Sequence, residues 1–333
     1  MKNWKETDKQ TAEYHRKIAV LAVAGICLLA GSPVMAAETE DLTLEQRVAQ
    51  LFFVTAGYQL LGSELLDLPV FIGVDEEGGR VARIANAGIM DTPHFSSMYE
   101  VSASGDPQEA YQAGKEIGVY LTELGIDTDF APVADVWSNA ENQVIGNRSF
   151  GTDSEKVAEM VTEAVRGFHD SHIRTAVKHF PGHGNTAEDS HSGFAYNYGT
   201  KEELENGEWK PFAAGIKEQS EFIMVGHICC PNIISKEIPA SLSKKLVTDV
   251  LRNEMEFNGI IITDAMDMGA VTTHYSCGEA AVQAVEAGVD MILMPENFQE
   301  AYEAVLQAVT DGRISEKRLN ESVSRILDCK KSR

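Results

Sequence analysis

The sequence has few cysteines, no low-complexity linker and a shortage of basic side chains. Five cysteines occur among 333 residues, and their spacings match neither a disulfide framework nor a Cys-x-x-Cys zinc site. No Pro- or Ser-rich stretch divides the chain, so we expect residues 38–333 to form one domain. Lys and Arg number 28 against 51 Asp and Glu, a net charge of −23. Such an acidic surface disfavours binding to nucleic acid and to anionic membranes.

The longest apolar run is too short for a typical membrane-spanning helix. Residues 18–31 form a nearly unbroken apolar run, whereas a spanning helix needs roughly 20 residues. Basic side chains precede the run and small residues follow it as far as Ala37. We therefore expect residues 1–37 to be a secretory signal peptide, with an uncleaved anchor as the alternative. The remaining protein would be secreted or associated with the cell wall, without stable membrane insertion.

Short apolar runs alternate with amphipathic stretches along the rest of the chain. The runs are rich in Ile, Val and Phe and predict strands at 51–56, 70–74, 128–133, 175–179, 222–227, 259–264 and 290–294. Apolar residues at three- and four-residue steps predict helices at 107–124, 155–171, 243–257, 278–287, 298–310 and 315–330. This alternation predicts an α/β fold, a parallel sheet with helices on both faces, and favours a TIM-type (β/α)8 barrel.

One strand–helix unit of this barrel is expected to be shortened or missing near residues 57–69. The pattern predicts seven strands where a barrel has eight. The centres of the first two strands are about 20 residues apart, whereas a strand–helix–strand step takes roughly 30 or more.

Five of the predicted strands end in, or are directly followed by, charged or imidazole side chains. They are Asp75-Glu76-Glu77, Asp135, Lys178-His179, His227, and Asp264 with Asp267. In barrels of this type the carboxyl ends of the strands build the active site. Packing alone does not explain five such strand ends, so we expect the active site there. Asp264, at the end of a buried strand, is placed as a nucleophile requires. A helix-capping role is the alternative, and Asp267 suits that role better.

A Gly- and Pro-containing loop follows Lys178-His179 and supplies Asp189 and His191, two residues apart. A carboxylate beside an imidazole orients it and raises its pKa, which suits a general acid near neutral pH. A surface loop with incidental histidines is the alternative. The histidines also suggest a zinc site. Pro181 interrupts any helical spacing, however, and we expect no metal and no organic cofactor.

Two further stretches suit sugar recognition. The acidic residues at Asp75 precede a glycine pair, and carboxylates accept hydrogen bonds from hydroxyl groups while glycine allows a close backbone approach. A solvated turn is the alternative. Arg148 can donate a fork of hydrogen bonds to a sugar oxygen or an acetamide carbonyl, or form an ion pair with a neighbouring acid.

These stretches together resemble glycoside hydrolase family 3, specifically its β-N-acetylhexosaminidase branch. Residues 250–264 (Val-Leu-Arg-Asn-Glu, four residues, then Gly-Ile-Ile-Ile-Thr-Asp) resemble the family's nucleophile signature. Residues 178–184 with the later Asp189-Ser-His191 resemble the acid/base loop of the branch. The resemblance covers roughly residues 43–330, and implies that residues 38–333 form a barrel domain of the family's N-terminal type.

The resemblance implies that Asp264 is the nucleophile and that His191, paired with Asp189, is the general acid/base. The side chains that would bind the terminal sugar are Asp75, Arg148, Lys178 and His179. The implied activity is that of a retaining exo-β-N-acetylglucosaminidase, which forms a covalent glycosyl-aspartate. We expect the protein to be a monomer. Its substrates would be peptidoglycan fragments or chitooligosaccharides carrying terminal β-linked N-acetylglucosamine.

Other activities are compatible with the same residues. A phosphorylase would use phosphate in place of water, although the acidic charge disfavours an anionic acceptor. Another family 3 β-glycosidase activity is a second alternative, and a metal-dependent hydrolase is a third. The shortening near residues 57–69 borders Asp75, so an inactive sugar-binding barrel is a fourth.

Overall fold

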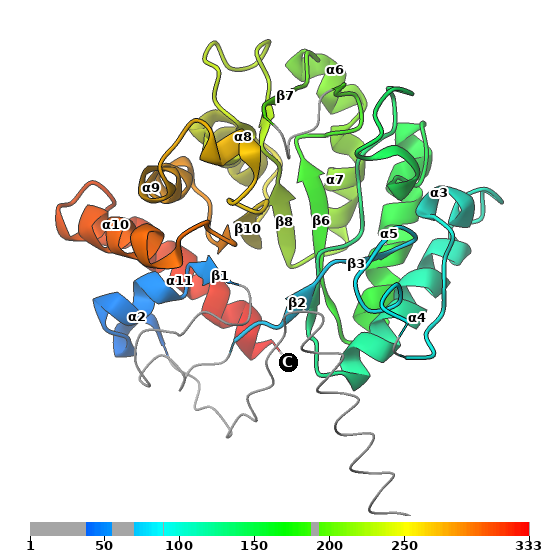
Figure 1. Ribbon diagram of the computed structural model, residues 1–333, viewed down its shortest axis with the longest axis horizontal. Helices are drawn as coiled ribbons and strands as arrows, with labels where there is room; N and C mark the ends of the chain where they lie inside the picture. The colour runs from blue at the N-terminus through cyan, green and yellow to red at the C-terminus, as the bar shows by residue number, and fades with distance from the viewer. Residues whose placement is uncertain (1–37, 55–69, 89, 188–192, 333) are drawn as a thin grey trace, which may run out of the picture.

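The computed structural model describes residues 38–54, 70–88, 90–187 and 193–332 (Figure 1). The expected signal peptide, the expected shortening at 57–69, and the pair Asp189 and His191 lie outside the described residues. In the described part of the chain, no helix is long and apolar enough to cross a membrane.

The chain alternates strands and helices. The strands are β1 (Phe52–Phe53), β2 (Gly73–Val74), β3 (Glu76–Gly78), β4 (Val81–Ala82), β5 (Thr128–Asp129), β6 (Arg174–Phe180), β7 (Ala195–Tyr196), β8 (Phe222–Val225), β9 (Ile228–Cys229), β10 (Ile260–Thr263) and β11 (Ile292–Leu293). The α-helices are α2 (Leu44–Ala49), α3 (Met98–Val101), α4 (Gln108–Glu123), α5 (Ser154–Asp170), α6 (Lys201–Asn206), α7 (Trp209–Lys217), α8 (Gly269–Thr272), α9 (Cys277–Ala287), α10 (Phe298–Thr310) and α11 (Glu316–Lys331). A π-helix, η5 (Lys245–Glu254), and the short 3-10 helices η1 (Thr39–Asp41), η3 (Gly146–Arg148) and η4 (Ala240–Leu242) complete the order.

Parallel strands form a continuous row at the centre of the molecule. β2, β5, β6, β8 and β10 are neighbours in one parallel sheet. A parallel bridge between Ile262 and Met291 continues the row from β10 towards β11, which pairs with β1. Each of the seven predicted apolar runs thus contributes a strand to this row. The expected α/β fold with a parallel sheet is confirmed.

Closure of the row into a barrel stays a prediction. Within the described residues, no backbone pairing joins β1 to β2. Aromatic rings lie there instead: Phe53 on β1 is parallel to Phe71 at a centroid distance of 6.4 Å and meets Phe130 edge-on at 5.3 Å.

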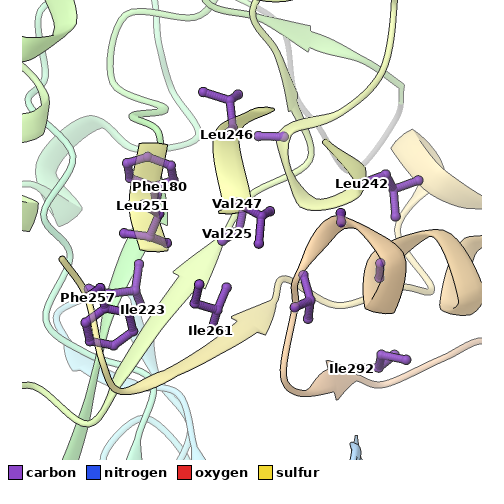
Figure 2. Packing of buried hydrophobic residues seen from close by; sticks show 14 of the residues in the cluster. Phe180, Ile223, Val225, Leu242, Leu246, Val247, Leu251, Phe257, Ile261 and Ile292 are labelled. Atoms are coloured by element: carbon purple, nitrogen blue, oxygen red, sulfur yellow. The ribbon is translucent and has the colours of Figure 1, made fainter. Parts of the chain in front are cut away.

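Alternation along the strands produces two apolar layers. On β8, Phe222 and Met224 belong to an inner cluster, whereas Ile223 and Val225 belong to the large outer cluster under the helices. This division follows from the period of two in a strand. Figure 2 shows part of the outer cluster, where residues of β6, β8 and β10 pack against η5. Its labelled members are Phe180, Ile223, Val225, Leu242, Leu246, Val247, Leu251, Phe257, Ile261 and Ile292.

The helices cover the outside of the row, with α4 packed on α5 and α5 on α7 (Figure 1). α4 and α5 approach closely because Gly167 lies at their crossing. A Cβ atom at Gly167 would be 2.1 Å from the carbonyl oxygen of Tyr111. The helix α7 was not among the predicted helices, and Pro211 occupies its third position. Proline is compatible with the first turn of a helix because the N–H groups there have no partner within the helix.

Candidate active site

A buried ion-pair network lies at the carboxyl ends of β2 and β6. Lys178 Nζ is 2.6 Å from Asp75 Oδ1 and 2.6 Å from Glu77 Oε1. Arg148 donates two hydrogen bonds to Glu77, of 2.8 and 2.7 Å. The Lys178 side chain is only 2% exposed and that of Glu77 only 1%. Lys178 and Arg148 therefore share one carboxylate in a site largely shielded from water.

These cations set the protonation state of Glu77. Burial alone would raise its pKa, but Arg148 and Lys178 hold the pKa well below its usual range. Burial likewise opposes the charge on Lys178, yet Asp75 and Glu77 raise its pKa above the ordinary value. The site thus holds fixed charges of both signs at neutral pH.

His179, the residue after Lys178, is held by a second buried carboxylate. Its Nδ1 donates to Asp135 Oδ2 at 2.7 Å, and its Nε2 is 3.4 Å from Arg148. Asp135 Oδ1 accepts from the backbone N–H of His183 at 2.7 Å. Although burial alone would raise the pKa of Asp135, His179 and His183 lower it. Asp135 thereby fixes both the ring of His179 and the start of the following loop.

Asp264 follows β10 and is partly exposed at the same end of the sheet. Its backbone N–H donates to the Val225 carbonyl at 2.9 Å, and its Oδ1 accepts from the Ala265 N–H at 2.8 Å. Burial alone would raise its pKa, but His179 and His227, together with the Ala265 bond, lower it. Asp264 is therefore an ionised carboxylate on a rigid strand end, which a nucleophile requires.

His227, at the end of β8, supports the segment that follows Asp264. One ring nitrogen is 2.7 Å from Ser241 Oγ and the other is 3.0 Å from the Ala265 carbonyl oxygen. Burial lowers the pKa of His227, so its ring is neutral at neutral pH. Among the described residues, no group of three or more His, Cys, Asp or Glu side chains is arranged to hold a metal ion.

The structure brings together five of the seven residues proposed for the site from the sequence. Asp75, Arg148, Lys178 and His179 lie within one network, and Asp264 lies in the electrostatic field of His179. The other two, Asp189 and His191, lie outside the described residues. Of the two roles considered for Arg148, the structure contains the ion pair, made with Glu77.

The sequence did not predict Glu77 as the partner of Lys178 and Arg148, nor Asp135 as the partner of His179. Glu77 stands beside Glu76, and nothing in the sequence tells which of the two faces the site. In the structure the Glu76 side chain points away from Lys178 and Arg148. It accepts hydrogen bonds from the N–H groups of Ile84 and Ala85 and from the Tyr120 hydroxyl. Strand alternation along β3 separates the two carboxylates. The pairing of Asp135 with His179 needs the register between neighbouring strands, which the sequence alone does not contain.

The loop at residues 181–187 is anchored from three sides. His183 N–H bonds to Asp135, and Asn142 Nδ2 donates to the His183 carbonyl at 2.7 Å. Gly184 packs directly on the Val136 carbonyl, where a Cβ atom would come within 1.8 Å. Asn197 Nδ2 donates both to the Gly182 carbonyl, at 3.1 Å, and to the carboxylate of Glu208, at 2.7 Å. Residues 181–187, the described start of the loop that leads to Asp189 and His191, are therefore held in a fixed position.

Glu208 makes the stability of this region dependent on pH. Burial raises the pKa of Glu208 to about 7 from an ordinary value of 4.5. The folded state keeps a proton that the unfolded chain loses above that ordinary value. The free energy of unfolding should therefore fall as pH rises between these two values.

We expect Glu208→Gln to remove this decrease in the free energy of unfolding. The decrease is on the order of 2 kcal/mol between about pH 5 and pH 8. Urea unfolding of both proteins at the two pH values measures the difference. The exposed Glu205→Gln serves as the control and should keep the pH dependence of the wild type. An equal pH dependence of the unfolding free energy in Glu208→Gln and wild type would show that the Glu208 carboxyl is not its cause.

Comparison with known proteins identifies the family. The profile of the glycosyl hydrolase family 3 N-terminal domain matches residues 4–329. Beta-hexosaminidase A of Pseudoalteromonas piscicida is 31% identical over 309 residues, which is 86% of this chain and 51% of that protein. Beta-hexosaminidase of Stenotrophomonas maltophilia (strain K279a) is 36% identical over 245 residues, 71% of each protein.

A solved structure gives the same result. The glycoside hydrolase family 3 beta-N-acetylglucosaminidase of Paenibacillus sp. str. FPU-7 superposes with a TM-score of 0.80 at 37% identity, covering 87% of this chain and 62% of that one. The chain thus spans about half of the Pseudoalteromonas protein and less than two thirds of the Paenibacillus chain. Because the profile of the N-terminal domain matches nearly the whole chain, residues 4–329, the chain belongs to glycosyl hydrolase family 3.

Proposed function

We propose that the protein is a retaining exo-β-N-acetylglucosaminidase that hydrolyses terminal β-linked N-acetylglucosamine from peptidoglycan fragments or chitooligosaccharides. The observation that carries the proposal is the ionised Asp264 at the end of β10, beside the network of Lys178, His179 and Arg148. The beta-hexosaminidase names of the relatives support the choice of sugar.

In this proposal Asp264 attacks the anomeric carbon and forms a glycosyl ester, which water opens in a second displacement. His191, oriented by Asp189, protonates the leaving oxygen and then deprotonates the attacking water. The two inversions restore the β configuration. Neither step requires a metal or an organic cofactor.

Lys178 and Asp75 are suited to holding the hydroxyl groups of the terminal sugar. An ammonium group has three N–H donors, and the two carboxylates beside Lys178 accept two of them. The third donor can turn to a sugar hydroxyl, while Asp75, which is 34% exposed, can accept from another. Glu77 fixes Arg148 and Asp135 fixes His179, and in this proposal the two fixed side chains border the space for the same sugar.

The proposal includes the cellular setting. Residues 1–37 act as the signal peptide, and the protein works as a secreted or cell-wall-associated monomer on carbohydrate. Nucleic acid is not a partner, in keeping with the net charge of −23.

Asp135 is a positioning residue in this account, and Asp135→Asn tests it. Asp135 now accepts hydrogen bonds from the His179 ring and from the His183 N–H. The asparagine amide would point an N–H group at one of these donors, and His179 would lose its charge-assisted hydrogen bond. We expect kcat/KM to fall roughly 10–100-fold, which corresponds to the 1.5–3 kcal/mol of such a bond. Asp170→Asn, on the outer helix α5, is the control. Unchanged kcat/KM in Asp135→Asn would contradict the role.

The proposed activity is tested by measuring 4-nitrophenol release from 4-nitrophenyl N-acetyl-β-glucosaminide with and without phosphate. Turnover that does not depend on phosphate supports the hydrolase. A requirement for phosphate would indicate a phosphorylase; a beta-glucoside phosphorylase, BglX, shares the fold at a TM-score of 0.80 and 24% identity. Loss of turnover on chelation would indicate a metal-dependent hydrolase. Binding of N-acetylglucosamine without turnover would indicate an inactive barrel.

A further inference from the structure

A strip of aromatic rings lies beside the candidate active site. Around β7, Ala195 and Asn197 are buried, whereas Phe194, Tyr196 and Tyr198 alternate with them and are partly or fully exposed. Because side chains of a strand alternate between its two faces, the three rings share one face. Tyr198 is 62% exposed. Several neighbouring rings that are at least partly exposed are typical of a binding surface.

The rings contact one another in a row. Phe194 meets Tyr196 at a centroid distance of 6.4 Å, and Tyr196 lies nearly parallel to Tyr198 at 5.8 Å. The exposed imidazole of His274 stacks on Phe194 at 4.0 Å. We call the set Phe194, Tyr196, Tyr198 and His274 the aromatic strip. These contacts hold the rings in place before a ligand binds.

The aromatic strip is joined to the candidate active site on two sides. β7 pairs with β9, whose first residue, Ile228, follows His227 at the end of β8. His274 follows α8, in the segment that continues from Asp264. Figure 1 shows β7 and α8 above the ends of β6 and β8. In the sequence Phe194 comes three positions after His191, the residue proposed to protonate the leaving group.

Polar groups accompany the rings. The Tyr196 hydroxyl donates to Glu237, and Asn232 Nδ2 donates to the Tyr198 carbonyl. A pyranose ring matches this combination of aromatic rings and polar groups, because its apolar C–H face is bordered by hydroxyl groups. Such faces pack on aromatic rings as other flat apolar groups do. The nearby carboxylate of Glu237 and the acidic surface favour a neutral sugar over an anionic one.

We propose that the aromatic strip binds the leaving-group sugars of a neutral β-linked N-acetylglucosamine oligosaccharide. The inference rests on the proposed function, since it takes the terminal sugar to lie at Asp264. It makes chitooligosaccharides, whose successive sugars are unsubstituted, better substrates than fragments with carboxylated sugars. Tyr198, at the exposed end of the strip, contacts sugars beyond the first one after the cleaved bond.

The test compares kcat/KM for the disaccharide and the tetrasaccharide of N-acetylglucosamine. In wild type kcat/KM should be higher for the tetrasaccharide. Tyr198→Ala should lower kcat/KM for the tetrasaccharide about tenfold and leave that for the disaccharide nearly unchanged. Tyr198→Phe should retain most of the tetrasaccharide activity. Tyr111→Ala, which removes a tyrosine from the outer helix α4, is the matched control and should affect neither substrate.

Calorimetric binding of the trisaccharide, measured with and without Tyr198→Ala in an Asp264→Asn background that does not hydrolyse the ligand, separates failure of this inference from failure of the proposed function. A protein without turnover would overturn the proposed activity, yet weaker trisaccharide binding by Tyr198→Ala would still support the aromatic strip as a sugar site. Three results would overturn the inference. Tyr198→Ala could have the kcat/KM of wild type on each substrate, or it could lose kcat/KM equally on both. The third result is unchanged trisaccharide binding by the variant.

Discussion

Asp264→Asn is expected to lower kcat for 4-nitrophenyl N-acetyl-β-glucosaminide by roughly 10⁴-fold or more, because the amide cannot form the glycosyl ester. The fold should be retained. The amide oxygen can still accept from the Ala265 N–H, and the Asp264 N–H still donates to Val225. Steady-state kinetics and the melting temperature, measured on the same preparation, check both parts of the prediction.

The matched control for this prediction is Asp267→Asn. Asp267 is an exposed carboxylate three positions further along the chain and should tolerate the change with little loss of kcat. A fall of less than about tenfold in Asp264→Asn, with normal folding, would exclude Asp264 as the nucleophile. A similar loss in both variants would show that the segment, and not the Asp264 carboxylate, is what turnover requires.

Glu77→Ala is expected to lower the free energy of unfolding by about 3–5 kcal/mol, because it leaves two buried cations without their shared partner. Both Lys178 and Arg148 bond to Glu77, and their side chains are only 2% and 10% exposed. Turnover should be lost as well, since the same bonds place Arg148 next to His179. Chemical denaturation at neutral pH measures the change in unfolding free energy.

An exposed ion pair provides the comparison for Glu77. Glu279 pairs with Arg313, and these side chains are 42% and 43% exposed. Exposed pairs contribute about 0–1 kcal/mol, so Glu279→Ala should have a small effect. If Glu77→Ala were no more destabilising than Glu279→Ala, the network would not stabilise the site as described.

The lowered pKa of Glu77 also predicts how the wild type responds to acid. A depressed folded-state pKa contributes stability above the ordinary value of 4.5, and this stability is lost as pH falls below it. The unfolding free energy of wild type should therefore drop on acidification below that value. Glu77→Ala should drop less over the same range.

The sequence was sufficient to predict the strand row and to place Asp75, Lys178 and Asp264 at one edge of it. Continuous apolar runs such as 259–264 are a strong signal because a parallel strand is buried on both faces. The carboxyl ends of such strands meet at one edge, so Asp75, Lys178 and Asp264 could be placed together without a structure. Partners within the site were harder to predict. Asp135 could be assigned only once the bridge between Val133 and Lys178 placed it against His179. Glu77 could be assigned only once the fold brought Arg148, on η3, against β3.

Loops and ends of elements were the least predictable parts. The predicted strand 128–133 is regular only over β5, because Pro132 has no N–H to donate to a ladder. A single bridge from Val133 to Lys178 continues it. The barrel closure near residues 57–69 and the roles of Asp189 and His191 remain predictions.

The most direct test of the central claim is to trap the glycosyl-enzyme. A 5-fluoro N-acetylglucosaminyl fluoride has a good leaving group, while its ring fluorine slows the second displacement. Incubation with wild type should add one sugar mass to the intact protein, and peptide mapping should place that mass on Asp264. Inactivation with the label on another residue, or turnover of natural substrate without any trapped adduct, would contradict the account.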